Sequence, residues 1–274
     1  MNPEMKKAVT EALGAEFVSD DPESLREFSR DRTENPGGNP ALVVAPGSVE
    51  DVQAVLAQAD RHRVPVYPVM GNTNLGGLSI PVRGGVVMRM HRMNRILEVS
   101  EQDQYAVIEP GVTWEQISEH LAQNHPGMRF AYPLSPPDTG VVPNCLMDGL
   151  ANLSLRHGTA SRWINALEVV LPSGDVLRTG HLAYGSATPC TNAPLPDLNG
   201  LFSGFQGTTG VVVKMAVHLW PERKHRKRLF LMAYDIDNGF ELFDTLARQD
   251  LVDDVGSLSL PTGKMLFGEY RPTY

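Results

Sequence analysis

The sequence predicts an α+β fold that is rich in short strands and irregular loops. Three observations carry this prediction. Residues 41–69 follow a strand, helix, strand order, residues 85–109 hold three short β-rich runs, and two apolar runs flank the turn residues 172–175. Because parallel strands need a long crossover and antiparallel strands only a tight turn, the first pattern predicts parallel pairing and the last predicts a hairpin.

The strand–helix–strand unit stands behind a short helix over 3–14 and a charged, Pro- and Gly-rich lead-in that ends at Pro40. Residues 41–45 and 64–69 are apolar runs of strand length. Between them, Ser48 and Asp51 have the spacing of a helix N-cap, and Val52, Val55, Leu56 and Ala59 follow at helical spacing. We expect a parallel pairing covered by this helix.

After this unit, the residues 213–219 show the clearest pattern. Apolar side chains alternate there with Lys214, Ala216 and His218, which predicts a strand with one core face and one wetter face. The other expected elements are strands over 85–90, 96–99 and 105–109, a helix from Thr113 with Trp114, Ile117 and Leu121 buried, a hairpin of strands 166–171 and 176–178, a strand over 229–234 and a helix over 240–247.

Composition limits the class of protein. Of the 274 residues, 42% are hydrophobic and 20% are charged, which allows one large core or two modest ones. The net charge of −8 disfavours a nucleic-acid surface, because phosphate binding depends on clustered Lys and Arg. No apolar run approaches the roughly 20 residues of a membrane span, and we recognise no secretory signal. We expect a cytoplasmic protein.

The two cysteines, Cys145 and Cys190, have no CxxC partner and no histidine at metal-ligand spacing. This pattern disfavours zinc, iron–sulfur and disulfide frameworks. We expect no metal site and two reduced thiols.

The glycine loop, residues 68–79, follows the second strand of the strand–helix–strand unit. Its glycines at 71, 76 and 77 permit positive φ angles and leave main-chain N–H groups free to converge on an anion such as a diphosphate. The spacing is not that of a Rossmann or Walker loop. A plain structural turn is the alternative.

Two further segments share this character. Residues 132–144 contain four prolines, which stiffen the chain where a loop must be held still, or simply form a surface loop. Residues 198–210 carry glycines at 204, 207 and 210, which suit close backbone approach or simple turns.

The order and spacing of these segments resemble the FAD domain shared by vanillyl-alcohol oxidase and 4-cresol dehydrogenase, the PCMH-type flavoproteins. The resemblance covers about 40–225 and rests on Val43–Pro46 with Val52, the glycine loop, 94–99, 107–113, 137–140, 168–180 and 200–221. It implies a PCMH-type fold of two α+β subdomains, about 41–110 and 111–225, with FAD held between them.

The same resemblance implies three groups of FAD-binding residues and a turn, Glu109-Pro110-Gly111, that lines the cleft. The first group is the diphosphate loop, Gly71, Asn72, Thr73, Asn74, Leu75, Gly76 and Gly77; the second is Pro137, Asp138, Thr139, Gly140, Val142, Asn144 and Gly149; the third is Gly210, Val211 and Val212. Asp138 falls on a family position near the reactive flavin edge, where a carboxylate tunes the flavin or handles a proton. An Asx turn after Pro137 is the alternative for this residue.

Two departures from the family pattern bear on function. Pro143 replaces a small residue, and 150–155 replaces an aromatic-rich segment, which changes the expected shape beside the flavin. Family members continue through a cap domain that binds substrate, and 226–274 resembles only its start. The expected organisation is therefore a lead-in over 1–40, the FAD domain over 41–225 and an incomplete cap over 226–274, either because the chain is a fragment or because a partner supplies the rest.

Three functions follow from the resemblance. The leading one is an FAD-binding subunit of an oxidoreductase that passes hydride from a small-molecule substrate, an aromatic alcohol or alkylphenol, to flavin N5, with a cap-bearing partner subunit and a protein electron acceptor. The second is a glycolate- or lactate-type hydroxy-acid dehydrogenase subunit. The third is a flavin-binding module without catalysis.

Overall fold

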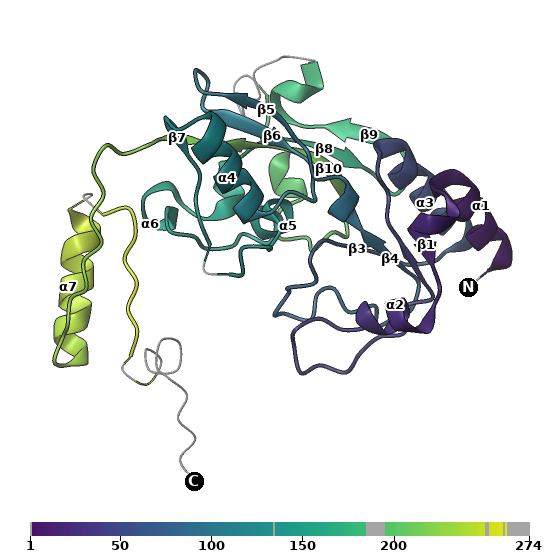
Figure 1. Cartoon of the computed structure of the whole chain (residues 1–274), viewed down its shortest axis with the longest axis horizontal. Coiled ribbons are helices and arrows are strands. Elements are labelled where there is room, and N and C mark those ends of the chain that lie inside the picture. The colour runs from purple at the N-terminus through teal and green to yellow at the C-terminus, as the bar shows by residue number, and fades with distance from the viewer. Residues whose placement is uncertain (1, 134, 185–194, 250–251, 260, 262–274) are drawn as a thin grey trace, which may run out of the picture. The chain divides into compact units, whose positions relative to one another are not determined.

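The computed structural model describes residues 2–133, 135–184, 195–249, 252–259 and 261. Its contacts divide the chain into two compact units: residues 1–151 with 159–222, and residues 152–158 with 223–274. The mixed helices and sheets confirm the predicted α+β class (Figure 1). None of the helices in the described ranges combines the length and the apolar character that crossing a bilayer requires.

The first unit opens with a four-stranded sheet in the order β1-β2-β4-β3, made of β1 (Val18–Ser19), β2 (Leu42–Val44), β4 (Val86–Arg89) and β3 (Val66–Val69). Helices α1 (Pro3–Leu13) and α3 (Val49–His62) lie side by side (Figure 1), and their buried residues share one core with Leu42 and Val86. Ser48 caps α3 as predicted, since its side chain accepts a hydrogen bond from the Asp51 N–H at 3.1 Å. A short helix, α2 (Pro22–Glu27), begins at the cap Asp21.

The pairing within this sheet corrects one expectation. The two strands of the strand–helix–strand unit, β2 and β3, do not bond to each other; each pairs in parallel with β4, which lies between them. The crossover through α3 therefore skips one strand position. The parallel direction was predicted, but the intervening strand was not.

The second sheet has the order β5-β6-β10-β8-β9, with β5 (Ile96–Ser100), β6 (Tyr105–Ile108), β10 (Val211–His218), β8 (Ile164–Val170) and β9 (Val176–Arg178). All its pairs are antiparallel, including the predicted β8–β9 hairpin. The predicted wetter face of β10 is only partly right. Lys214 and His218 are half-buried, but Ala216 is buried with Tyr105, Val107 and Ala166, because β10 is a central strand between β6 and β8.

An aromatic cluster gathers all three tryptophans of the chain around Phe130. Trp114 stacks on the Phe130 ring at 4.8 Å between centroids, and Trp163 meets Trp220 edge to face at 5.4 Å. The cluster joins α4 (Trp114–Asn124) to the short pair of β7 (Met128–Arg129) and β11 (Trp220–Pro221). Such pairs add roughly 0.5–1.5 kcal/mol each beyond their buried area.

The second unit contains α6 (Ser154–His157) and α7 (Ile236–Arg248), and α7 confirms the predicted helix over 240–247. The strand expected over 229–234 is wrong: these residues form no strand, and Phe230, Met232 and Tyr234 are 98%, 89% and 99% exposed. An isolated run of apolar residues gains strand structure only from a partner strand, and the described residues of this unit supply none.

Candidate functional site

The glycine loop follows β3 without regular secondary structure, and its asparagines give it a defined shape. Asn72 has a φ of 51°, the left-handed conformation that Asn adopts more readily than most residues. The Asn74 side chain folds the second half of the loop, because its Oδ1 accepts from the N–H groups of Gly76 at 2.7 Å and Leu78 at 3.1 Å. The Leu75 side chain is 77% exposed.

The first half of the loop has unpaired donors. Within the part of the chain that the structure describes, the main-chain N–H groups of residues 71–75 have no protein acceptor. Successive unpaired N–H groups around a left-handed residue form an anion-binding concavity, because their partial positive charges add at one point. This half of the loop therefore has the donor set that a diphosphate requires.

Three segments that are distant in sequence meet at this loop. A Cβ on Gly71 would lie 3.4 Å from the Asp138 carbonyl oxygen, and the hydroxyls of Thr73 and Thr139 are 3.5 Å apart. On the other side, a Cβ on Gly207 would lie 3.4 Å from Pro68 Cγ. The predicted first and second groups therefore adjoin, and the third glycine-rich segment reaches the start of the loop.

The second segment is bonded to Val112 and to the first two residues of α4, Trp114 and Glu115. Trp114 N donates to Thr139 O at 3.1 Å, Glu115 N to Pro137 O at 3.1 Å, and Val141 N to Val112 O at 3.0 Å. Thr139 is buried, and Gly140 packs so closely that a Cβ would lie 3.1 Å from Met70 Cγ. These contacts fix the proline-rich loop against the glycine loop, which agrees with the first of the two interpretations of its composition.

Helix α5 (Val141–Leu146) has Gly140 as its N-cap residue and carries Asn144. Val142 is buried, and Gly149 packs against Asn144, whose Nδ2 would lie 2.6 Å from a Cβ. Asn144 Oδ1 is buried and has no hydrogen-bond partner in the described ranges. A buried acceptor without a donor is costly, so Asn144 fits a ligand that supplies an N–H or O–H group.

The third predicted group lies at the start of β10. Val211 and Val212 are buried and pair with Val170 and Val169 of β8. A Cβ on Gly210 would lie 2.7 Å from Val169 Cγ1, so glycine serves close packing of the strands there. The structure therefore places Val211 and Val212 in the sheet and Gly210 immediately before it, and the role of the three residues toward FAD stays a prediction.

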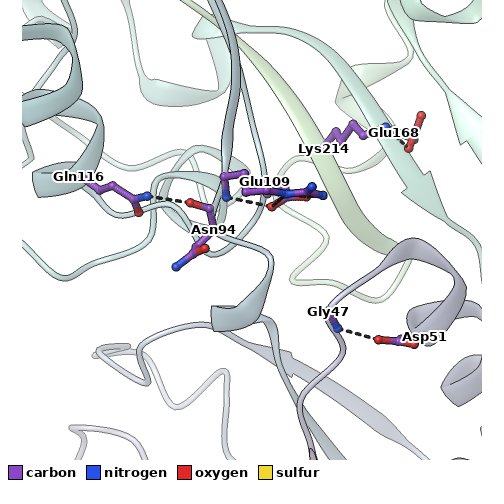
Figure 2. A network of polar contacts seen from close by, with 8 residues as sticks. Gly47, Asp51, Asn94, Glu109, Gln116, Glu168 and Lys214 are labelled. Atoms are coloured by element: carbon purple, nitrogen blue, oxygen red, sulfur yellow. Dashed lines mark hydrogen bonds and ion pairs between the residues drawn. The ribbon is translucent and has the colours of Figure 1, made fainter. Parts of the chain in front are cut away.

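The turn Glu109-Pro110-Gly111 is held by a clamp that the sequence did not reveal. The buried Glu109 carboxylate accepts from Arg95 Nη2 at 2.6 Å and from the Arg95 main-chain N–H at 2.8 Å. Gln116 Nε2 donates to Asn94 O at 2.7 Å, so α4 is tied to the same hairpin (Figure 2). The register between the strands 96–100 and 105–108, and not any local motif, brings Arg95 to Glu109.

Asp138 is exposed beside Gly71, and its carboxylate makes no hydrogen bond to any residue that the structure describes. Among the described residues no main-chain N–H donates to this carboxylate, so it forms no Asx turn there; the turn is closed by Thr139 N, which donates to the Pro136 carbonyl at 3.0 Å. Of the two cysteines, Cys145 is a buried free thiol in α5, and Cys190 lies outside the described residues.

A strand-flanked glycine loop with unpaired N–H groups, next to a second loop bonded to α4, is the arrangement expected of a nucleotide-binding α+β domain. The comparisons specify which one. A family model described as FAD binding domain matches residues 40–180. The chain belongs to this family, its type is that of the PCMH and vanillyl-alcohol oxidase flavoproteins, and FAD is the family's cofactor.

The solved structures that resemble the chain include the 4-ethylphenol oxidase of Gulosibacter chungangensis, at a TM-score of 0.74 and 29% identity over 81% of this chain and 43% of that one. Another is p-cresol methylhydroxylase, at a TM-score of 0.72 and 26% identity over 81% of this chain and 44% of that one. Both confirm the predicted PCMH-type fold.

Among curated relatives, the glycolate oxidase subunit GlcD of Bacillus subtilis is 30% identical over 94% of this chain and 54% of its own length. The chain thus spans about half the length of the relatives it matches. Relatives of both predicted substrate types occur, so the comparisons support an FAD-dependent oxidoreductase family and leave the substrate open.

Proposed function

We propose that this chain is the FAD-carrying part of an oxidoreductase that removes hydride from a C–H bond of an aromatic alcohol or alkylphenol. The observation that carries the proposal is the run of unpaired N–H groups over 71–75, which meets the second loop at Asp138 and Thr139. Asn144, in the helix that follows Gly140, adds a buried acceptor, Oδ1, that has no hydrogen-bond partner among the described residues.

In this proposal the glycine loop, Asn144 and the second loop each contact a different part of the cofactor. The N–H groups of the glycine loop bind the diphosphate, and Asn144 Oδ1 accepts a hydrogen bond from the ligand. FAD, when bound, supplies the hydride acceptor at flavin N5. Thr139 and Val141 hold the second loop in place beside it, because the main chain of Thr139 is bonded to Trp114 and that of Val141 to Val112.

We assign Asp138 to the substrate side of the site. Its carboxylate is exposed and unpaired in the described structure, so it is free to hold or accept a proton as substrate is oxidised. The Asp138 main chain packs closely against Gly71, and this contact keeps the carboxylate next to the glycine loop. Replacing Asp138 by Asn should lower turnover while leaving FAD binding within about 2-fold, since the amide keeps the size but loses the proton-accepting group.

The remaining parts of the proposal concern partners and domains. We place the FAD domain at 41–225 and the start of a cap-like domain at 226–274, completed by a partner subunit that covers the exposed Phe230, Met232 and Tyr234. A protein electron acceptor would re-oxidise the cofactor. A cytoplasmic location remains part of this proposal.

A 2-hydroxy acid such as glycolate is the second candidate substrate. The relative named as a glycolate oxidase subunit supports it, because the similarity extends over 94% of this chain. Anaerobic reduction of the FAD-loaded chain, with and without its partner, by a panel of alkylphenols and 2-hydroxy acids would separate the two candidates by the loss of the flavin absorption band.

The direct test of the proposal uses Leu75, whose exposed side chain tolerates replacement. Leu75→Glu adds a negative charge to the loop and should weaken FAD binding by about 5-fold or more at low salt, with a smaller effect at high salt. Leu75→Gln, of nearly equal size, should bind FAD like the wild type. Titration with FAD, read by quenching of tryptophan fluorescence, measures both. Equal affinities for the two variants, or a wild-type chain that binds no FAD, would reject the proposal.

A further inference from the structure

The lead-in residues 29–39 lie against the glycine loop. Arg32 N donates to Asn74 O at 3.2 Å, and the Asn72 side-chain amide donates to Arg30 O. A Cβ on Gly77, which has a φ of 76°, would lie 2.7 Å from Asn35 Nδ2. Both asparagines that shape the loop are thus bonded to a segment that precedes the matched FAD domain, which begins at residue 40.

This segment is closed on itself. Gly38 N donates to Ser29 O at 2.7 Å, so the two ends of the segment are hydrogen-bonded to each other and residues 30–37 form a closed loop. Inside the closure, Asp31 Oδ1 accepts from both the N–H (2.9 Å) and the hydroxyl (2.6 Å) of Thr33, and Thr33 Oγ1 accepts from Asn35 Nδ2 at 3.1 Å. Three short polar side chains therefore set the path of residues 31–35.

The position of Asn72 shows why this matters. A non-glycine residue in the left-handed conformation is strained, and its neighbours must hold it there. The Asn72 side chain is held from two sides, by Arg30 O and by Ser79, whose hydroxyl donates to Asn72 Oδ1 at 3.0 Å. The left-handed conformation in turn groups the unpaired N–H donors of residues 71–75.

We propose that residues 30–35 are a strap that holds the glycine loop in its anion-binding shape, with Asp31 and Thr33 as positioning residues for FAD. This inference rests on the proposed function and adds residues 30–35, which precede the FAD domain expected over 41–225. The strap and a bound diphosphate would both fix the same loop conformation. An ordered strap should therefore increase the affinity for FAD, and bound FAD should in turn stabilise the ordered strap.

Thr33→Ala tests the strap, because it removes the hydroxyl and its three hydrogen bonds, one to Asp31 Oδ1 and two from the N and Nδ2 atoms of Asn35, without changing a residue of the glycine loop. We expect the dissociation constant for FAD to rise about 5- to 30-fold, with the melting temperature of the FAD-free 274-residue chain within about 2 °C of wild type. Thr33→Ser keeps the hydroxyl and should restore affinity to within about 2-fold. The matched control is Ser173→Ala, which breaks a similar turn, Ser173 Oγ to Asp175 Oδ2 at 2.8 Å, in the β8–β9 hairpin.

Limited trypsin digestion supplies a second readout, since Arg30 and Arg32 are exposed cleavage sites within the strap. FAD should slow cleavage after these residues in the wild type and protect them less in Thr33→Ala. Equal FAD affinity in Thr33→Ala and wild type, an equal loss in Ser173→Ala, or cleavage that FAD does not slow would overturn the strap. A wild-type chain that fails to bind FAD would overturn the proposed function as well, so the two failures are distinguishable.

Discussion

The Arg95 guanidinium contacts both carboxylate oxygens of Glu109, with Nε 3.1 Å from Oε1 and Oε2 and Nη2 2.6 Å from Oε1. The exposure of the partners is unequal: the Arg95 side chain is 70% exposed and the Glu109 side chain 2%. Hydrogen bonding to Glu109 and its negative charge raise the pKa of Arg95. Arg95 thus supplies the positive charge that pairs with the buried Glu109 carboxylate.

Glu109→Gln should test this clamp. The amide keeps the size of the side chain but loses the charge and cannot accept the same set of bonds, so the free energy of unfolding should fall by about 1–3 kcal/mol. FAD binding should weaken too, because Glu109 is bonded through Val112 to the second loop. Urea denaturation and FAD titration measure the two effects. Glu11→Gln, in an exposed pair with Lys7, is the control and should change neither.

Gly111 occupies a position where only glycine fits. A Cβ would lie 2.6 Å from Met90 O and 2.7 Å from Met93 O, and both of these are main-chain atoms that cannot rotate away. Gly111→Ala should therefore lower the free energy of unfolding by about 1–3 kcal/mol or more. Gly200→Ala is the matched control, because nothing lies within 4 Å of its Cβ. Thermal denaturation of the two variants measures the difference. Equal melting temperatures for Gly111→Ala and Gly200→Ala would show that the turn shifts to accommodate a Cβ.

The same residues show what the sequence does and does not predict. The helix α3 was predictable because its signals are local: a cap at Ser48 and apolar residues at helical spacing. The insertion of β4 between β2 and β3 was not, because strand pairing joins residues far apart in sequence. Ala216 illustrates a second limit. Alanine occurs on buried and on exposed faces of strands, so its presence did not show that this face of β10 is buried in the core.

For the site, the glycine loop and the stiff second loop were recognisable from their composition, and the structure brings them together at Gly71 and Asp138. The strap was not, although Asp31 and Thr33 have the types and spacing of a side-chain turn. Such turns occur in many surface loops. The contacts of Arg32 with Asn74 and of Arg30 with Asn72, each spanning 42 positions of sequence, give this one a role.

Cys145 should be inert to thiol reagents while the chain is folded. Burial raises the pKa of its thiol to about 12, and the negative charge of Asp148 adds to this. Because the thiolate is the reactive form, modification by a disulfide reagent at pH 8 should be at least about 100-fold slower than in urea. The measurement needs Cys190→Ser, which leaves Cys145 as the only thiol. Rapid modification without urea would show that α5 opens readily.

Glu168 gives the fold a dependence on pH. This buried carboxylate in β8 contacts Arg178 Nε at 2.7 Å and Lys214 Nζ at 3.0 Å, and the second contact is drawn in Figure 2. Burial acts to raise the pKa of Glu168, but hydrogen bonds and charges from Arg178 and Lys214 outweigh it and lower the pKa below its ordinary value of 4.5.

A carboxyl group whose pKa is lower in the folded than in the unfolded chain stabilises the fold above the unfolded pKa, and this stability is lost as the pH falls through the folded pKa. Wild type should therefore exceed Glu168→Gln in free energy of unfolding by a constant amount at neutral pH, about 1–3 kcal/mol, and the difference should shrink as the pH falls below about 4.5. Urea titrations at pH 7, 5 and 3.5 measure this difference. If it stayed the same across that range, the ion pairs of Glu168 would contribute nothing to the stability of the folded sheet.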